Sequence, residues 1–196
     1  MMEPTDKSLM DAHCRGDSAA FATVLRRHGP SVFAALVRLT GDRSMAEDLL
    51  QETFARAHEK ARTLRTEHVR AWLLRIATHL AMDSFRRKRR LQVVSLSATC
   101  GDGENCPEFS ATLADPRVGE PSASMELEEK RKRVRRAIDA LPPKQRTTLV
   151  LSYYQQLSYS EVAVVLGCSA GTVKTQMFRA LKSLAQLLPS PTGGDL

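Results

Sequence analysis

The sequence predicts an all-α protein: two small helical domains joined by a flexible linker, the C-terminal one with a helix-turn-helix. Three observations predict this architecture. Apolar residues recur at spacings of three and four in two long blocks, which is the period of amphipathic helices. Capping boxes and a proline start mark where several of these helices begin. Between the blocks lies a stretch rich in Ser, Ala, Gly, Pro and acidic residues, as in linkers.

The first domain is expected at residues 1–90, with four helices between Ser8 and Arg90. Turn-forming residues punctuate the pattern at Gly16, His28-Gly29-Pro30, Gly41-Asp42 and residues 62–67. The clearest helix start is a capping box, Ser44 followed three residues later by Glu47. The last helix carries an apolar stripe, which consists of Val69, Trp72, Leu73, Ile76 and Leu80 and ends at the basic run that begins with Arg86. Its position on this stripe predicts that Trp72 is a core residue.

The linker is expected at residues 91–126, where six acidic side chains stand against Arg117 alone. Basic runs at residues 86–90 and 130–136 flank it. The second domain is expected at residues 127–188, followed by a disordered tail at residues 189–196, and a helix should start at Pro142-Pro143. The two domains share no repeat, so they are interpreted as separate modules.

The pattern of the second domain predicts two short helices that form a helix-turn-helix. Ser158 and Glu161 form a capping box at the start of the first helix, and Gly167 ends it. The second helix has an apolar stripe, predicted to be buried, at Val173, Met177, Ala180, Leu184 and Leu187. Its other face combines a glycine, hydroxyls, an amide and cations, which suit phosphates and base edges in a major groove. The alternative is an ordinary helical hairpin whose basic face is merely solvated.

Composition narrows the class of protein. The chain has 196 residues and a formal net charge of +7, which favours an anionic partner such as nucleic acid. It offers neither clustered acids for a metal nor a nucleophile beside a base, so we expect no enzyme, no metal and no cofactor. The four cysteines lack CxxC spacing, although a metal- or redox-responsive site of His13-Cys14 with Cys100 and Cys106 stays open. Without an apolar signal core or membrane span, the protein is expected in the cytoplasm.

Several motifs, taken together, resemble those of extracytoplasmic-function sigma factors of bacterial RNA polymerase. Region 2 of that family is similar to Gly41-Asp42, Ala46–Phe54, Ala71–Ala77 and Asp83 ahead of Arg86-Arg87. Region 4 is similar to Leu141-Pro142-Pro143, Leu157–Ala163, Leu166-Gly167-Cys168 and Gly171–Lys174. The resemblance implies a promoter-specificity subunit that binds core RNA polymerase and promoter DNA, as a monomer on the polymerase. It also implies a stress signal and an anti-sigma partner.

The resemblance assigns roles to residues of both domains. Region 2 would dock on the polymerase clamp through Asp48, Leu49, Gln51, Glu52 and Phe54. The alternative is an ordinary surface helix whose acidic residues lie near its N-terminus because the helix dipole favours them there. Cations on and beside the last helix of region 2 would hold the opened minus-ten element, at Arg65, Arg70, His79, Arg86, Arg87, Arg89 and Arg90. Region 4 would read the minus-thirty-five element with Gly171, Thr172, Lys174, Thr175, Gln176, Phe178 and Arg179.

Three departures from the family pattern bear on promoter preference. The loop of residues 62–69 lacks a frequent aromatic side chain, His79 stands where Asn is common, and Gln176 replaces a frequent Arg. A function of another class also stays open. An autonomous repressor or activator could use the helix-turn-helix alone, as a dimer on an inverted repeat without polymerase.

Overall fold

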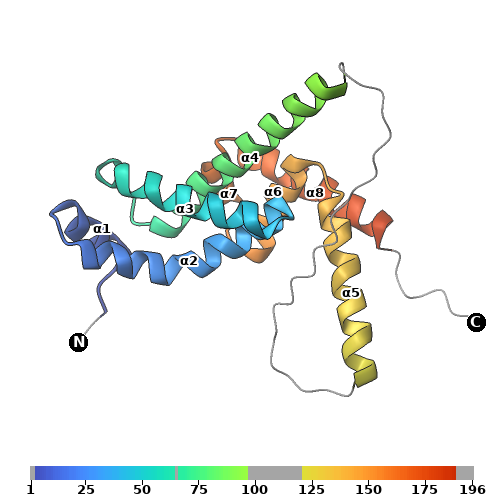
Figure 1. Ribbon diagram of the computed structural model, residues 1–196, viewed down its shortest axis with the longest axis horizontal. Helices are drawn as coiled ribbons and strands as arrows, with labels where there is room; N and C mark the ends of the chain where they lie inside the picture. Colours follow the sequence, from blue (N-terminus) through green and yellow to red (C-terminus); the bar gives the residue numbers. More distant parts are fainter. Residues whose placement is uncertain (1–2, 65, 97–120, 189–196) are drawn as a thin grey trace, which may run out of the picture.

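The structure, a computed structural model, describes residues 3–64, 66–96 and 121–188; for residues 88–96 and 121–126 it describes the backbone alone. Within these ranges every regular element is a helix, which confirms the all-α prediction (Figure 1). Arg65 and the segments 97–120 and 189–196 lie outside the described residues, and with them the expected linker flexibility, the expected tail, Cys100 and Cys106. None of the described helices is long and apolar enough to cross a membrane.

The N-terminal half contains four α-helices, as predicted. They are α1 (Asp6–Cys14), α2 (Ser18–Thr40), α3 (Arg43–Glu59) and α4 (Val69–Leu96), with a 3-10 turn, η1 (Ala61–Thr63), before α4. Side chains of Thr5, Asp17 and Asp42 cap the first three at their N-termini. Gly41 ends α2 with φ 70°, a left-handed conformation that glycine adopts without steric cost.

Two local predictions in this half are wrong. The capping box at Ser44 does not form, because Asp42 caps α3 instead and Glu47 pairs with Arg43. The break at residues 28–30 is absent, because α2 continues through Pro30. Proline removes one helical hydrogen bond, but Pro30 and the Arg26 carbonyl that loses its donor belong to exposed residues. Buried residues before and after it, such as Val24 and Val32, hold the helix together.

The C-terminal half contains α5 (Pro121–Asp139), α6 (Pro143–Leu149), a π-helical turn η2 (Val150–Tyr154), α7 (Tyr159–Leu166) and α8 (Ala170–Leu187). The predicted starts at Pro143 and Tyr159 are confirmed. Helix α4 runs to Leu96 and α5 begins at Pro121, so helical backbone extends into both ends of the predicted linker. Lys and Arg are good helix formers, so the basic run after Arg86 prolongs the helix, and proline suits the first turn of α5.

The helix-turn-helix has the caps that the sequence predicts. The Ser158 and Glu161 side chains each bond the other's backbone N–H, which is a complete capping box. The Ser158 hydroxyl and the Ser158 amide both donate to the Glu161 carboxylate, at 2.7 and 2.8 Å, and these bonds hold the pKa of that carboxyl below its ordinary value. Gly167 ends α7 with φ 66°, and the Ser169 hydroxyl accepts from the Thr172 amide at 3.1 Å to start α8.

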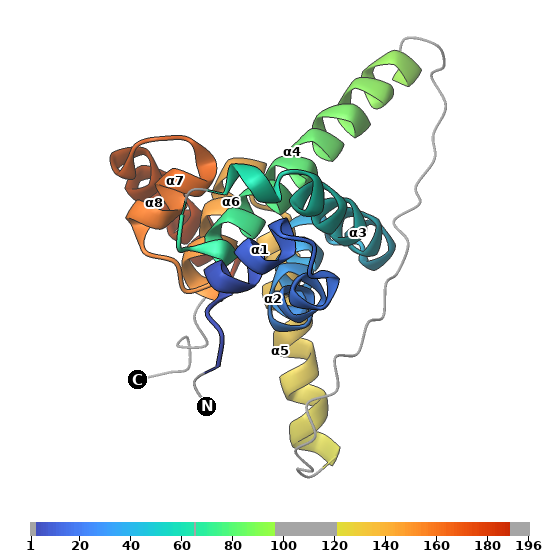
Figure 2. The ribbon, with the colours of Figure 1, turned by 90° about the vertical axis from the view of Figure 1, so that its left-hand side faces the viewer.

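The core joins the two halves, which contradicts their interpretation as separate modules. One apolar cluster contains Leu36 of α2 and Leu73 of α4 together with Leu151 of η2 and Val162 of α7. A smaller cluster in the C-terminal half comprises Ile138, Leu141, Leu149 and Ala180. The α7 helix packs beside the start of α4, while the ends of α4 and α5 project from the body in opposite directions (Figure 2).

Two predictions about individual apolar residues can be checked against this core. Trp72 is half-buried and packs against the larger cluster, as expected of a core residue. On α8, Val173 and Ala180 are buried and Met177 and Leu184 are half-buried. Leu187 is exposed, so the prediction of a buried side chain is wrong at the last position of the stripe. The end of α8 extends beyond the helices that pack against it.

Candidate nucleic-acid interface and partner-docking face

The exposed face of α8 gathers the polar residues that the sequence singles out. Gly171, Thr172, Lys174, Thr175 and Arg179 are exposed on its first turns, and Gln176 is half-buried at the edge. Among the described residues, no acidic side chain pairs with Lys174 or Arg179. The N-terminus of a helix also favours anions through its free amides and dipole. This face therefore suits a phosphate backbone.

Two further residues complete the α8 face. Phe178 is 70% exposed and follows Thr175 by three positions, so its ring lies in the middle of the polar face. An exposed ring there can contact a thymine methyl group. A Cβ at Gly171 would meet Ser169 Oγ at 3.7 Å, an ordinary contact, so packing within the protein does not require glycine at this position. The glycine leaves room for an external surface.

The cations predicted along α4 do not form one face. His79 and Arg86 lie on the same side of the helix, and the His79 Nδ1 lies 2.8 Å from the Arg75 carbonyl oxygen of its own helix. Arg86 pairs with Asp83 at 3.1 Å, and Arg87 is exposed. Arg70 instead points into the C-terminal half, as described below. The side chains of Arg89 and Arg90 and the whole of Arg65 lie outside the described residues.

The sequence reasoning missed Arg75, an exposed cation four residues before His79 and eleven before Arg86. These spacings place all three on one side of α4. The same spacing rule, applied to every cation on the helix, would have found it. The basic face of α4 therefore comprises Arg75, His79 and Arg86 among the described side chains.

A second, oppositely charged face lies on α3. Asp48, Gln51 and Glu52 are exposed on one side of the helix, as predicted, and Leu49 at its edge is half-buried. Glu52 forms an ion pair with Arg56 at 2.7 Å. No described residue pairs with Asp48 or Gln51, so the side-chain oxygens of both can accept hydrogen bonds from a partner. We call Asp48, Gln51 and Glu52 the acidic face.

Phe54 does not belong to this acidic face. Its side chain is only 6% exposed and lies edge-on to Phe21, with ring centroids 6.3 Å apart. The expectation that it touches a partner is wrong, because the helical period turns position 54 toward α2. Phe54 supports the face by fixing α3 on the core.

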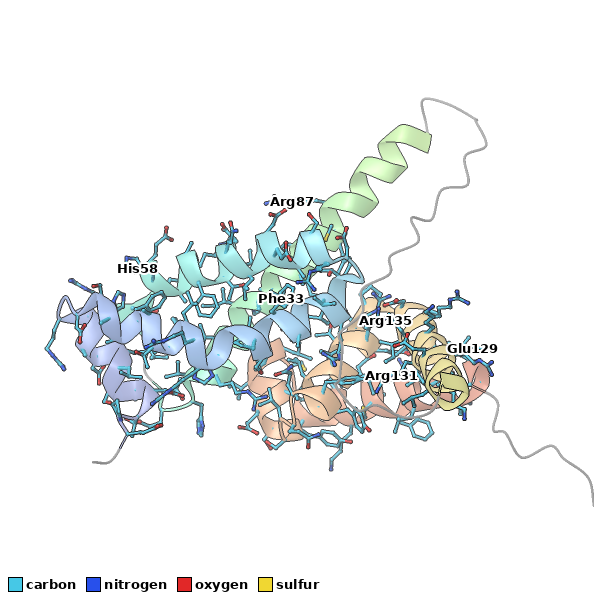
Figure 3. All side chains as sticks on the ribbon, turned by 60° about the horizontal axis from the view of Figure 1, so that its bottom comes forward. Phe33, His58, Arg87, Glu129, Arg131 and Arg135 are labelled. Atoms are coloured by element: carbon cyan, nitrogen blue, oxygen red, sulfur yellow. The ribbon has the colours of Figure 1, made fainter. Side chains whose placement is uncertain are left out.

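The two basic runs that flank the predicted linker lie on different helices. Figure 3 shows Arg87 on α4 and Arg131 and Arg135 on α5, far apart on the molecule. On α5, Arg131 and Arg133 face Glu128 and Glu129 at 3.9 and 2.8 Å. Part of that charge is therefore balanced locally. Over the ranges that the structure describes, no group of His, Cys, Asp or Glu is placed to hold a metal ion.

An ion cluster fixes the N-terminal helix beside these faces. Asp6 at the start of α1 contacts Arg27 at 2.9 Å and His28 at 2.7 Å, both on α2. Burial alone would raise the pKa of the Asp6 carboxyl, but the hydrogen bonds from Arg27 and His28 outweigh it and hold that pKa below its ordinary value. The α1 helix thus rests on the N-terminal half through a charged contact.

Comparison with known proteins identifies the family of the chain that carries these faces. The family model for sigma-70 region 2 matches residues 24–91, and that for sigma-70 region 4 matches residues 131–184. The ECF RNA polymerase sigma factor SigE of Mycolicibacterium smegmatis is 32% identical over 193 residues, which cover 95% of this chain and 68% of SigE. SigW of Bacillus subtilis, also an ECF sigma factor, is 32% identical over 176 residues, 89% of this chain and 91% of SigW.

The chain is an extracytoplasmic-function sigma factor. It directs RNA polymerase to promoters and is an initiation factor, not an enzyme. Core RNA polymerase and promoter DNA are its partners. The acidic face and the α4 cations lie within the region 2 match, and the α8 face lies within the region 4 match.

Solved structures show the same fold. CnrH, solved in complex with the cytosolic domain of CnrY, superposes with a TM-score of 0.65 at 24% identity, covering 94% of this chain and 97% of CnrH. RpoE of Bartonella quintana, solved with the anti-sigma factor NepR, gives a TM-score of 0.63 at 24% identity, covering 87% of this chain and 98% of RpoE. Both support the helical architecture of this sigma factor.

Proposed function

We propose a division of labour among the three faces of this ECF sigma factor. The acidic face of α3 docks on core RNA polymerase, the basic face of α4 holds the minus-ten element, and α8 reads the minus-thirty-five element. The observation that carries the proposal is α8: a capped helix N-terminus that exposes Lys174 and Arg179 beside Gly171, with no acidic partner among the described residues. That surface suits phosphates and base edges.

Reconstitution with core polymerase tests the whole proposal. The purified chain should form a complex with core enzyme in gel filtration. Mapping of transcript starts after overexpression of the chain identifies candidate promoters. On templates that carry these promoters, the complex should start run-off transcripts at a defined position. Core enzyme alone is the control. A chain that neither binds core enzyme nor starts transcripts would refute the proposal.

The same purified chain also tests the alternative hypothesis, an autonomous regulator that binds DNA without polymerase. That alternative predicts tight binding of the lone chain, as a dimer, to an inverted repeat in a gel shift. The match of residues 24–91 to sigma-70 region 2 supports the sigma-factor hypothesis, because a lone helix-turn-helix regulator needs no polymerase-docking half. We expect a monomer on the polymerase and no stable dimer on DNA.

An anti-sigma partner and a cytoplasmic location are further parts of the proposal. NepR is an anti-sigma factor bound to a fold neighbour of this chain. Exposed apolar residues on α7 and α8 offer a contact for such a partner; Val164 is 66% and Leu181 51% exposed. A candidate inhibitor should form a complex that survives gel filtration and suppresses run-off transcription. It should lose affinity when Val164 and Leu181 are changed to serine, whereas serine at exposed Ala19 should have no effect.

A further inference from the structure

The two threonine hydroxyls on the α8 face differ in what they can offer to DNA. A threonine hydroxyl carries one proton and two lone pairs, so it can donate one hydrogen bond and accept others. Thr172 and Thr175 are both exposed on the first turns of the helix. Which of them can donate to an outside molecule depends on where the protein already holds each proton.

The proton of Thr175 is held by its own helix. Its Oγ1 donates to the Gly171 carbonyl at 3.0 Å, one helical turn earlier. Within the described residues this hydroxyl makes no other hydrogen bond. The Thr175 hydroxyl therefore presents only its lone pairs to an outside molecule. It can accept a hydrogen bond there, whereas donating one would first break its bond with Gly171.

Thr172, in contrast, can direct its proton outward. Ser169 Oγ accepts from the Thr172 amide at 3.1 Å and lies 2.9 Å from Thr172 Oγ1, and either hydroxyl can donate in this second contact. When Ser169 donates, the Thr172 proton can turn to an anion outside, and each of the two bonds strengthens the other. Thr172 therefore suits a phosphate oxygen, which accepts hydrogen bonds.

Thr175 occupies the middle of the α8 face. Gly171 precedes it by four residues and Arg179 follows it by four, so the three lie in one row along the helix. Helical side chains lean toward the N-terminus of their helix, so the Thr175 side chain leans toward Gly171. Because Gly171 has no side chain, a base edge can reach Thr175 from that direction. The Phe178 ring, 70% exposed, stands on its other side at a spacing of three.

Base edges in the major groove differ in which of them can donate a hydrogen bond. Adenine presents its N6 amino group and cytosine its N4 amino group, whereas guanine O6 and N7 and thymine O4 only accept. A hydroxyl that can only accept therefore favours adenine or cytosine over guanine and thymine. The bond with Gly171 sets this preference, since a hydroxyl with a free proton could serve either kind of base.

We propose that Thr175 determines specificity by accepting a hydrogen bond from the exocyclic amino group of a base in the minus-thirty-five element. Its bond with Gly171 keeps the hydroxyl an acceptor, and Thr172 contacts a phosphate instead. This assignment rests on the proposed function, because it requires α8 to lie in the major groove. It adds the chemistry of one base, an amino-bearing base opposite Thr175.

Selection of DNA by the polymerase complex tests the assignment. Core enzyme carrying the full chain selects from promoters, mapped as above, in which the minus-thirty-five positions are randomised one at a time, and sequencing gives the base preference at each. At one position the parent should prefer adenine or cytosine. In Thr175→Val this preference should fall by about twofold to tenfold, the worth of one neutral hydrogen bond. Thr175→Ser keeps the hydroxyl and should keep the preference.

Nucleoside analogues identify the amino group. At the position found, deoxynebularine replaces deoxyadenosine, or deoxyzebularine replaces deoxycytidine; each analogue lacks the exocyclic amino group. The parent should lose about the same factor in affinity as it loses by Thr175→Val. The analogue should cost Thr175→Val less than it costs the parent, because that variant has already lost the contact. Weaker base pairing affects both proteins alike, and the two analogues tell adenine N6 from cytosine N4.

Two further variants serve as controls. Thr23→Val on α2 removes a hydroxyl that makes the same kind of bond to its own helix, to the Ala19 carbonyl at 3.0 Å, and it should change no base preference. Thr172→Val should weaken binding to every sequence alike, because phosphates carry no sequence information. Circular dichroism should show parent helix content in all variants.

The outcomes separate this assignment from the proposed function. A minus-thirty-five preference that is the same in the parent and in Thr175→Val would overturn the role of Thr175 and leave promoter recognition by α8 standing. A change confined to a position that prefers guanine or thymine would overturn it too, because the hydroxyl would then be donating. A parent with no base preference at any minus-thirty-five position would refute the proposed function of α8, and the role of Thr175 with it.

Discussion

At the residue scale, charge decides which exposed side chains can act on DNA. Lys174 and Arg179 are exposed and have no described ion-pair partner, whereas Arg86 and Arg56 already face carboxylates at 3.1 and 2.7 Å. A free cation releases counterions when it meets a phosphate, and a paired one must first give up its partner. Lys174 and Arg179, on the first turns of α8, should therefore dominate the salt dependence of minus-thirty-five binding.

Removing either cation should make binding less sensitive to salt. For Lys174→Ala and Arg179→Ala, the slope of log affinity against log salt should fall by about one unit each, because each loses one phosphate contact. Titration of labelled minus-thirty-five duplex at several salt concentrations measures it. Lys60→Ala makes the same charge change in the other half and should leave the slope unaltered. A slope that stays at the parent value in both α8 variants would assign the contacts elsewhere.

The acidic face makes a prediction about polymerase. Asp48→Ala and Gln51→Ala should each weaken binding to core enzyme by about tenfold, because each removes an acceptor from an exposed docking surface. Melting temperatures should stay within about 2 °C of the parent, since neither side chain is buried. Glu59→Ala, an exposed acid at the far end of α3, is the control. Parent-like core affinity in both variants would exclude the acidic face as the docking surface.

At the scale of elements, caps position the reading helix. The α7 helix starts at the Ser158–Glu161 capping box and ends at left-handed Gly167, and α8 starts two residues later at the Ser169 cap. These short-range bonds fix where each helix begins and ends, while buried α7 residues such as Val162 and Val165 pack the pair against the core. Loss of a cap should therefore disturb α8 as well as α7.

The capping box should give the fold a pH dependence. Ser158→Ala should lower the free energy of unfolding by about 1 kcal/mol at neutral pH. The folded-state pKa of Glu161 is lowered, so this contribution is full above the unfolded pKa of about 4.3 and is lost as pH falls through the folded value. Denaturant titrations from about pH 3 to pH 7 should show parent and variant converging in acid. A difference that does not change with pH would mean that the Glu161 carboxylate takes no part.

At the scale of the whole molecule, the shared core makes the two halves unfold together. Leu151 is fully buried in the cluster that joins α2, α4 and α7, whereas Leu149, two residues earlier, packs in the small C-terminal cluster. The hydrogen bonds of Gln155 with Ser31 and Arg70 lie at this same boundary.

Leu151→Ala should weaken both halves. The expected loss is about 2 to 5 kcal/mol of unfolding free energy, and amide hydrogen exchange should quicken in α4 as well as in α7. Leu149→Ala has similar chemistry but should speed exchange mainly in α5, α6 and α8. If α4 exchanges at the parent rate in Leu151→Ala, the halves do not share a cooperative core.

The sequence by itself determined most of the helices, the caps of α7 and the surface chemistry of α3 and α8, because spacing, capping residues and glycine stops act over a few neighbouring positions. It therefore predicted Pro143, Ser158, Gly167 and the exposed residues of α8 correctly. It failed at Pro30, where distant packing carries the helix through a local break. It also failed at Phe54, which lies against Phe21.

Only the tertiary structure decided how the halves meet. The contacts of Gln155 with Ser31 and Arg70 join residues 124 and 85 positions apart, and no local pattern announces them. A polar side chain can be solvated or buried with equal local propensity, and its choice depends on which donors the distant chain brings to it. For that reason Arg70 looked like a free DNA contact in the sequence, but in the folded chain it is held by the other half.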